Sequence, residues 1–239
     1  MATRILVTRP GNPGLELVEK LGYKSLSVRH GPTLVIEALP LNPLSTEYDA
    51  IIYISRTAVE ASVSIDPEFG QRGKKVFAVG PGTAKTLQQA GVTKVIIPES
   101  FNSEGLLALP ELSEVMSQRI LIVKGEGGRP LLGDTLISRG AKIDYLDVYR
   151  RRAIAIEPEV WDWFWSGKNE RIVTCASIET LEAFDAQRIA SEKPQTVTIC
   201  VASDRIAEAC RRLGYTKIIS AGGAANKHFV AALNQLTDV

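Results

Sequence analysis

Short apolar runs alternate with amphipathic stretches along the whole chain. Such runs are typical of strands buried in a parallel sheet, and apolar residues spaced three or four apart are typical of helices that cover it. The first half predicts strands at 5–7, 48–54, 76–79 and 94–97 and helices at 13–21, 57–64 and 83–90. The second half predicts strands at 120–123, 172–175 and 197–201 and helices at 131–138, 179–184 and 205–213. The pattern indicates an α/β protein whose parallel sheets carry helices on both faces.

Three blocks of sequence recur in the same order. TRILVTRPGNPG from Thr3 resembles QRILIVKGEGGR from Gln118, and DAIIYISRTAVEA from Asp49 resembles ERIVTCASIETLEA from Glu170. TLQQAGVTKVII, in the first half, resembles EACRRLGYTKIIS in the second. Because the spacing is nearly constant, the blocks predict a duplicated unit of about 120 residues.

Composition and charge narrow the class of protein. The 239 residues include 45% hydrophobic and 23% charged residues, and the formal net charge is +1, so no overall field recruits nucleic acid or a membrane surface. The three cysteines form no C-x-x-C pair, which favours a reducing compartment. No apolar run approaches a membrane span or a signal peptide, so we expect a cytoplasmic protein.

Ligands of parallel α/β sheets bind beyond the carboxyl ends of the strands, where helices begin. This rule selects four pairs of loops, one member from each half: 9–14 with 124–130, 55–57 with 177–179, 80–83 with 203–205, and 103–105 with 226–228. An anionic small molecule is the ligand that such loops favour, because helix N-termini carry partial positive charge.

The most conspicuous of these loops is KGEGGRP, residues 124–130. It is no dinucleotide fingerprint, because Pro130 stands where the third glycine belongs, and the G-P-G at residues 80–82 fails at Lys85 in the same way. No Gly-Lys-Ser/Thr phosphate loop and no G-x-S-x-G elbow is present. The two histidines, His30 and His228, are too few for an obvious metal cluster, so we expect no metal site.

The candidate binding residues are hydroxyls, glycines and cations at the strand ends. Each has a plainer interpretation: the hydroxyls can be N-caps worth about 1 kcal/mol, the cations solvated, and the glycines tight turns. The recurrence in both halves favours substrate binding. The candidates are Arg9, Ser55, Arg56, Thr57, Gly80, Pro81, Gly82, Thr83, Ser103, Lys124, Gly125, Gly127, Gly128, Arg129, Ser177 and Ser203.

The ordered set ILVTRP, DAIIYISRTAVEA, VFAVGPGTAKTLQQAG, SEGLLAL, RILIVKGEGGRPLL, DVYRRR and CVASDRIAEACRRLG resembles the uroporphyrinogen-III synthase family over nearly the whole chain. The segment EPEVWDWFWSGK, residues 157–168, is not part of the resemblance. The family's fold implies two similar α/β domains, 1–36 plus 154–239 and 39–151. It also implies a two-stranded β-ladder hinge joining them and a cleft between them.

The resemblance also implies a reaction. Hydroxymethylbilane, a linear tetrapyrrole with eight carboxylates, loses its terminal hydroxyl, passes through a spiro intermediate and closes with ring D inverted. The enzyme of this family is a lyase that works without a cofactor, mainly by positioning its substrate. The family's candidate proton donor corresponds to Tyr149, whose phenol hydroxyl can donate a proton. The plainer interpretation of Tyr149 is a half-buried strand residue.

Other features have structural interpretations. Trp161, Phe164 and Trp165 share one helical face and are expected to contact the core, and Tyr53 is expected to be buried in a strand. Arg150, Arg151 and Arg152 form an exposed linker strand, or one of them reaches into the cleft. We expect a monomer that binds a small molecule. The alternative is a non-enzymatic two-lobed protein that binds a small anion or has a regulatory role.

Overall fold

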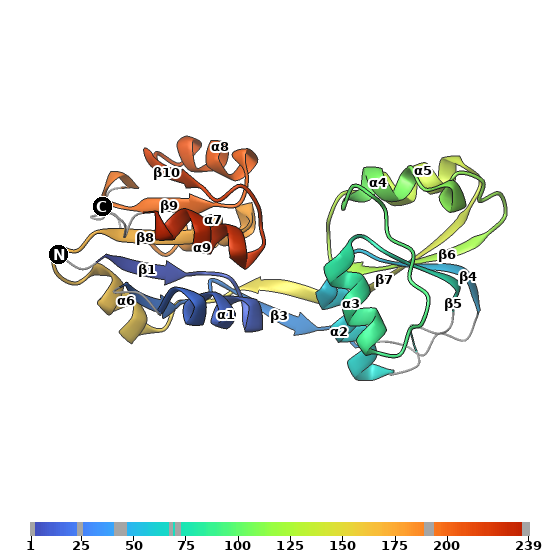
Figure 1. Cartoon of the computed structure of the whole chain (residues 1–239), viewed down its shortest axis with the longest axis horizontal. Helices are drawn as coiled ribbons and strands as arrows, with labels where there is room; N and C mark the ends of the chain where they lie inside the picture. The colour runs from blue at the N-terminus through green and yellow to red at the C-terminus, as the bar shows by residue number, and fades with distance from the viewer. Residues whose placement is uncertain are drawn as a thin grey trace. The chain divides into compact units, whose positions relative to one another are not determined.

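The computed structural model describes residues 3–22, 26–40, 47–66, 69, 73–188 and 194–235. The chain divides into two compact units. Unit 1 comprises Met1–Ile36 and Arg152–Val239, and unit 2 comprises Glu37–Arg151 (Figure 1). The chain thus leaves unit 1 once and returns to it once.

Unit 1 is built on a five-stranded parallel sheet. Its strand order is β10-β9-β8-β1-β2. In register, Ile5 lies between Val28 on one side and Ile172 on the other. The strands are β1 (Arg4–Val7), β2 (Ser27–His30), β8 (Arg171–Cys175), β9 (Thr198–Val201) and β10 (Lys217–Ser220).

Five helices accompany this sheet in the described part of unit 1. α1 packs beside α9, α7 packs beside α8, and α6 contacts β1. The helices are α1 (Gly11–Gly22), α6 (Pro158–Trp165), α7 (Ile178–Asp185), α8 (Asp204–Arg212) and α9 (Asn226–Asn234). A short 3-10 helix covers Pro194–Thr196. In α6, Phe164 is buried and packs edge-on against Trp165, while Trp161 packs against Phe184, so the aromatic cluster contacts the core as predicted.

Unit 2 repeats the plan with the strand order β3-β7-β6-β4-β5. β4 pairs in parallel with β5 and β6, and β6 pairs in parallel with β7. The segments of β3 and β7 run in opposite directions, because Leu39 donates to Val148 while Ile154 donates to Thr33. These two strands are also the segments in which the chain passes between the units. The strands are β3 (Leu34–Ala38), β4 (Tyr48–Tyr53), β5 (Gly73–Ala78), β6 (Arg119–Gly125) and β7 (Lys142–Ala153).

Two pairs of helices cover the sheet of unit 2. α2 packs beside α3, and α4 packs beside α5. Figure 1 shows the first pair on one side of the sheet and the second pair on the other. The helices are α2 (Arg56–Ile65), α3 (Pro81–Gln89), α4 (Ser103–Leu107) and α5 (Leu131–Ser138), with a 3-10 turn at Pro110–Leu112. The α/β class with parallel sheets and helices on both faces is therefore confirmed.

The duplicated sequence blocks exchange partners in space. β1, from the first block, pairs with β8 of the second repeat, and β6, which matches β1 in sequence, pairs with β4 of the first repeat. Each sheet therefore contains strands of both repeats. Local sequence similarity indicates which segments are strands, but side-chain packing across the sheet decides which segments pair.

The predicted strand at 94–97 is wrong as a regular element. Only Ile96 bridges to Phe77, with backbone bonds from Ile96 N–H to Val76 and from Ala78 N–H to Ile96. Thr93, Lys94 and Ile97 are exposed, and Ile96 alone of residues 94–97 packs against the core cluster of unit 2. Helix α1 begins at Gly11, which makes the second half of the predicted 9–14 loop helical. His30 is the last residue of β2.

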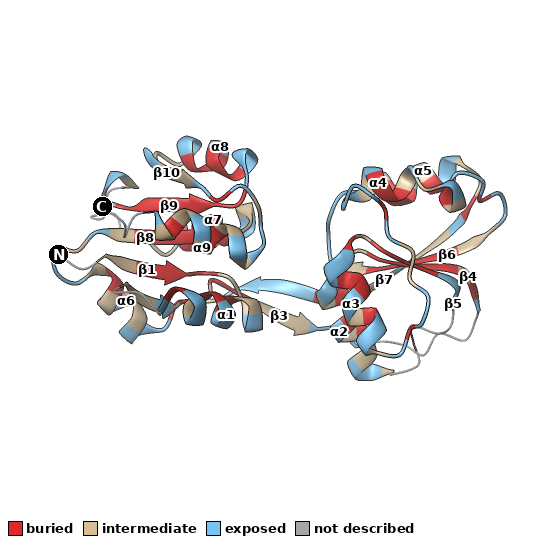
Figure 2. Ribbon diagram, viewed as in Figure 1, coloured by how far each residue is buried: buried red, intermediate tan, exposed pale blue. Residues whose placement is uncertain are grey.

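Each unit has its own apolar core, coloured red along the central strands in Figure 2. Ile5, Val173 and Ile199 are fully buried in unit 1, and Ile52 and Ile120 are fully buried in unit 2. Tyr53, at the end of β4, is fully buried as predicted. The central strands are apolar on both faces because helices cover both faces of the sheet.

Candidate active site

The carboxyl ends of β4, β5 and β6 meet at one edge of the second sheet because the three strands are parallel. Ser55 follows β4, Gly80 follows β5, and Gly125 ends β6. The bridge from Phe77 to Ile96 brings the segment before α4 to the same place. We call this the carboxyl edge of unit 2, and it unites the site residues predicted from this part of the chain.

Ser55 is the N-cap of α2. Its hydroxyl accepts the Ala58 N–H at 3.0 Å, and its backbone is extended, at φ −161° and ψ 158°. The capping interpretation of Ser55 is therefore realised in the fold. Arg56 and Thr57 open the helix; Arg56 is exposed, and its Cδ would lie 3.4 Å from a Cβ at Gly82. Arg56 thus lies against the first turn of α3.

The GPGT segment begins α3 without a side-chain cap. Gly80 is the N-cap residue in extended conformation, and Pro81 is the first helical residue. Proline suits that place because it has no N–H to satisfy. The N–H groups of Gly82 and Thr83 consequently have no side-chain acceptor at the cap, while the Thr83 side chain is buried. An uncapped N-terminus of this kind favours an anionic group.

Phe101 was missed by the sequence reasoning. Its side chain is 60% exposed although it is large and apolar. It lies against Gly80, where an added Cβ would be 3.1 Å from the Phe101 Cβ. The available signal was the glycine itself, because a glycine at a helix start can mark the close approach of another group.

Ser103 is not the cap of α4. The N-cap is Asn102, whose side-chain oxygen accepts the Gly105 N–H at 2.7 Å, and Ser103 is the first helical residue. Asparagine and serine cap helices about equally well, so the sequence FNSEG allowed both alignments. The Ser103 side chain is partly exposed at the carboxyl edge of unit 2.

Lys124 holds its own loop together. Its Nζ forms an ion pair with Asp147 at 2.7 Å and donates to the carbonyls of Gly125 at 3.2 Å and Gly127 at 2.9 Å. The side chain is only 16% exposed. A cation with these partners stabilises the turn that follows β6.

The tip of the KGEGGRP loop is open. Gly127 and Gly128 have φ values of +75° and +93°, and a Cβ at either position would meet nothing within 4 Å. Both glycines are needed for the left-handed backbone rather than for space. Arg129 reaches back to Glu104 at 2.6 Å, and this hydrogen bond lowers the pKa of Glu104. Both side chains of that pair are more than half exposed.

Tyr149 is placed by an irregularity in β7. Lys124 pairs with Asp147 and Gly125 with Tyr149, so β7 carries one extra residue, Val148, at this step. Val148 and Tyr149 are both buried although they are adjacent in the strand. Bulges of this kind turn a side chain toward a new direction. Here the ring of Tyr149 packs over Gly125, and the Glu126 N–H donates to the Tyr149 carbonyl at 2.8 Å.

The hydroxyl of Tyr149 has two polar partners. Arg151 Nη2 lies 3.0 Å from Tyr149 Oη, and the guanidinium lies 5.3 Å from the centre of the ring. Ser55 Oγ lies 3.4 Å from the same oxygen. Tyr149 is 3% exposed, so it is buried rather than half-buried. The resemblance pointed to Tyr149, but it did not indicate that Arg151 and Ser55 would meet it.

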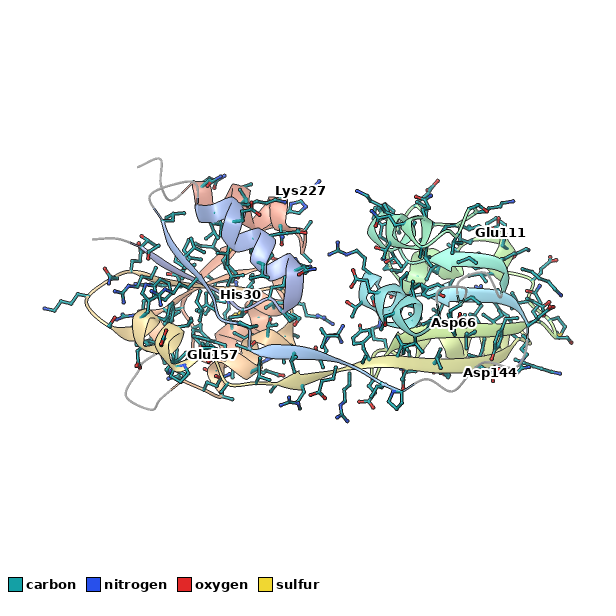
Figure 3. All side chains as sticks on the ribbon, turned by 90° about the horizontal axis from the view of Figure 1, so that it is seen from below. His30, Asp66, Glu111, Asp144, Glu157 and Lys227 are labelled. Atoms are coloured by element: carbon teal, nitrogen blue, oxygen red, sulfur yellow. The ribbon has the colours of Figure 1, made fainter. Side chains whose placement is uncertain are left out.

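The carboxyl ends of the parallel strands of unit 1 form the carboxyl edge of unit 1. Arg9 lies at this edge and has a structural role. Arg9 Nη1 donates to the Ala224 carbonyl at 2.6 Å and to Asn226 Oδ1 at 3.1 Å. The Arg9 carbonyl lies 2.8 Å from Nε2 of His30, which is labelled in Figure 3. Gly14 is required because a Cβ there would lie 2.0 Å from the Arg9 carbonyl oxygen.

The serines of unit 1 differ in their capping. Ser177 caps α7 in a reciprocal capping box with Thr180, as Ser55 caps α2 in the other repeat. Ser203 occupies the N-cap position of α8 without a side-chain cap bond and is exposed. α3 and α8 are therefore matched helices whose N-termini both lack a side-chain cap, whereas α2 and α7 are both capped.

A surface hollow of about 560 Å³ lies elsewhere in unit 2. It is bounded by the start of β5, the end of α3 and Glu111, which Figure 3 labels. None of the predicted site residues lines it. It opens where strands begin and helices end, a location that lacks the N–H groups of a helix start.

Within the described ranges, no three His, Cys, Asp or Glu side chains are grouped so that they could hold a metal ion. No helix in those same ranges is both long and apolar enough to cross a bilayer.

Known proteins of one family match this chain over most of its length. The family model described as uroporphyrinogen-III synthase HemD matches residues 16–231. The chain is 32% identical to the uroporphyrinogen-III synthase of Escherichia coli over 253 aligned positions, covering 96% of this chain and 99% of that protein. It is 31% identical to the Salmonella typhimurium enzyme of the same name, with the same coverage.

Solved structures show the same fold. The uroporphyrinogen-III synthetase of Helicobacter pylori superposes with a TM-score of 0.68 at 17% identity, covering 99% of this chain and 100% of that chain. A mutant uroporphyrinogen III synthase of Thermus thermophilus gives 0.62 at 17% identity, covering 100% of both chains. With the family model spanning most of the sequence and close relatives covering nearly all of it, the chain belongs to the uroporphyrinogen-III synthase family.

Proposed function

We propose that this chain converts hydroxymethylbilane into uroporphyrinogen III, acting as a cyclising hydro-lyase without a cofactor. The observation that carries the proposal is the position of the Tyr149 hydroxyl, which lies at the carboxyl edge of unit 2 within hydrogen-bonding distance of Ser55 and Arg151. Family membership supplies the reaction. The Tyr149 hydroxyl, at the edge where the helices begin, is the proton source that we propose.

The substrate's carboxylates need sites that do not depend on net charge. The uncapped starts of α3 and α8 are the best candidates, because their N–H groups have no side-chain acceptor at the cap. Gly80–Thr83 and Ser203 are the corresponding residues. Arg56 is an exposed cation beside the first of these sites. Ser55 and Ser177 contribute differently, since their hydroxyls already hold α2 and α7.

The glycines of the KGEGGRP loop have separate roles in this proposal. Gly127 and Gly128 leave backbone open to an approaching carboxylate, and Gly125 makes room for the Tyr149 ring. Lys124 and Arg129 act indirectly, by holding the loop in its conformation, because their side chains form ion pairs with Asp147 and Glu104. The remaining candidates, Arg9, Thr57 and Ser103, border the two edges.

Tyr149 is the source of the proton that the departing water needs. General acid catalysis of this kind contributes about 10²- to 10⁴-fold to a rate. Positioning of the folded bilane supplies the rest, because the enzyme must favour one carbon of ring D over its neighbour. We propose that units 1 and 2 are the two domains. We also propose that the protein is a monomer in the cytoplasm.

The test generates hydroxymethylbilane in situ, adds the protein and separates the isomers after oxidation. The expected product is type III at micromolar protein or below. Type I as the sole product would contradict the proposal and favour the alternative of a non-enzymatic anion-binding protein. The oligomeric state is measured in parallel by light scattering, where a mass near 26.0 kDa is expected.

A further inference from the structure

We propose that Arg151, Tyr149 and Ser55 form a directed hydrogen-bond relay in which Ser55, not Tyr149, hands the proton to the substrate. This inference rests on the proposed function of the carboxyl edge of unit 2. It assigns Arg151 as a positioning residue and Ser55 as the group that touches the leaving hydroxyl. All three residues belong to unit 2.

Arg151 sets the direction of the relay. A guanidinium has only donors, so the 3.0 Å contact must run from Arg151 Nη2 to Tyr149 Oη. One lone pair of a phenol oxygen is delocalised into its ring and accepts hydrogen bonds poorly. The bond from Arg151 therefore uses the other lone pair of Tyr149 Oη. The Tyr149 proton is then directed to the other polar partner, Ser55 Oγ, at 3.4 Å.

Ser55 is able to receive that proton. A serine hydroxyl has one donor and two acceptor lone pairs. One lone pair holds the Ala58 N–H at 3.0 Å and the second faces Tyr149 Oη. The serine's own proton is left to point outward from the start of α2. The 3.4 Å separation is long, but bonds between catalytic groups often shorten when the substrate is bound.

Burial explains why a relay is needed. Tyr149 is 3% exposed, with its ring enclosed against Gly125 and its hydroxyl held by Arg151. A substrate oxygen has little access to such a phenol. Ser55 is partly exposed at the same edge, so its hydroxyl can meet the substrate while Tyr149 remains enclosed.

The reaction returns to the enzyme the one proton that it takes from it. Ser55 Oγ protonates the leaving hydroxyl as the carbon–oxygen bond breaks and its electron pair stays on oxygen, and Ser55 takes the Tyr149 proton in the same step. The products are water, the azafulvene cation and a Tyr149 phenolate beside the Arg151 guanidinium. Ring D loses one proton when the macrocycle closes. Passed back through Ser55, that proton restores Tyr149.

The first test is a double-mutant cycle between Arg151→Met and Tyr149→Phe. In the wild-type background, we expect Arg151→Met to lower kcat about tenfold and to change KM less than about twofold. In the Tyr149→Phe background, Arg151→Met should change kcat less than about twofold, because the group it orients is already gone. Arg151→Lys should recover part of the loss. The matched control is Arg150→Met, on the same strand, whose exposed ion pair with Glu37 lies outside the relay.

The second test uses Ser55 and does not depend on Arg151→Met folding. Glycine caps helices nearly as well as serine, so Ser55→Gly removes the hydroxyl while α2 keeps its start. We expect kcat to fall at least about tenfold for Ser55→Gly and to be largely kept by Ser55→Thr. Ser55→Gly combined with Tyr149→Phe should be no worse than the poorer single variant.

The outcomes separate the two proposals. If the wild-type protein forms no type III product, the proposed function fails. If the wild type is active but the losses of Arg151→Met and Tyr149→Phe multiply, or Arg151→Met raises KM alone, the relay is wrong and Arg151 binds substrate directly. If Ser55→Gly keeps wild-type kcat while Tyr149→Phe does not, Ser55 is not the donor and Tyr149 reaches the substrate itself.

Discussion

Gly125 leaves the space that the ring of Tyr149 fills. A Cβ at Gly125 would lie 2.4 Å from Cζ and 2.5 Å from Cε2 of that ring. The φ angle of Gly125 is not in the left-handed region, so the glycine is needed for the close approach of the ring and not for a turn. Gly125 in the KGEGGRP loop is thus required for the packing of Tyr149, the candidate proton donor.

Gly125→Ala should displace Tyr149 and lower kcat at least about tenfold, because the added methyl group cannot share the space of the ring. The comparison is Gly127→Ala, which strains a left-handed residue by about 1 kcal/mol but meets no neighbouring atom. Kinetics and thermal unfolding of both variants check this. Equal losses in the two variants would mean that loop conformation, and not the position of Tyr149, governs activity.

Tyr149→Phe should lower turnover at least about tenfold while leaving the fold intact, since only the hydroxyl and its bonds to Arg151 and Ser55 are removed. Circular dichroism and the unfolding midpoint measure the fold, and the yield of type III isomer measures turnover. Near-normal activity would move proton donation to the substrate, to water or to another residue.

Phe101→Ala should raise KM several-fold with little change in the free energy of unfolding, because the side chain is 60% exposed and offers a flat apolar face at the carboxyl edge of unit 2. The control is Met116→Ala, an apolar side chain that is 75% exposed and lines a different hollow with Ser117 and Gln118. An unchanged KM for Phe101→Ala would exclude Phe101 from substrate binding.

Lys124→Met and Arg129→Met should differ in stability. Lys124 is 16% exposed and has three partners, Asp147 in β7 and two loop carbonyls, so its loss should lower the free energy of unfolding by about 1 to 2 kcal/mol. Arg129 forms one exposed ion pair, and its loss should cost less than about 0.5 kcal/mol. Urea unfolding measures both. A larger cost for Arg129→Met would contradict the structural role assigned to Lys124.

The three cysteines should be unreactive in the native protein. Cys175, Cys200 and Cys210 are buried, and burial raises the pKa of Cys200 to about 12 and that of Cys210 to about 11. Since the thiolate is the nucleophile, a thiol reagent at pH 8 should label none of them until denaturant is added, when all three react. Rapid labelling of the native protein would show that unit 1 opens locally.

Most of the regular elements were predictable from the sequence. Helix 131–138 was placed to the residue, and the strands at 5–7, 120–123 and 172–175 lie within one or two residues of their observed limits. Short apolar runs between helices leave few other assignments. The hydrophobic pattern missed strands β2, β3 and β10 and most of β7, because these strands are only partly buried and their alternation is weak.

The candidate site was predictable only in part. Helix starts at Ser55, Gly80 and Ser177 follow from the strand–helix rule, but which of them are capped depends on side-chain geometry. Asn102 and Ser103 were equivalent in sequence, and the fold uses Asn102. Phe101 gave no local signal of its exposure.

The sequence by itself determined the order of strands and helices, the duplication and the glycines and hydroxyls at the strand ends, because these depend on local hydrophobic pattern and turn chemistry. Only the tertiary structure decided that β1 pairs with β8 and β6 with β4, and that Tyr149 lies over Gly125 between Ser55 and Arg151. Such contacts join residues that are far apart in the chain. They are fixed by packing across the sheet and by one extra residue in β7, and neither leaves a mark in the local sequence.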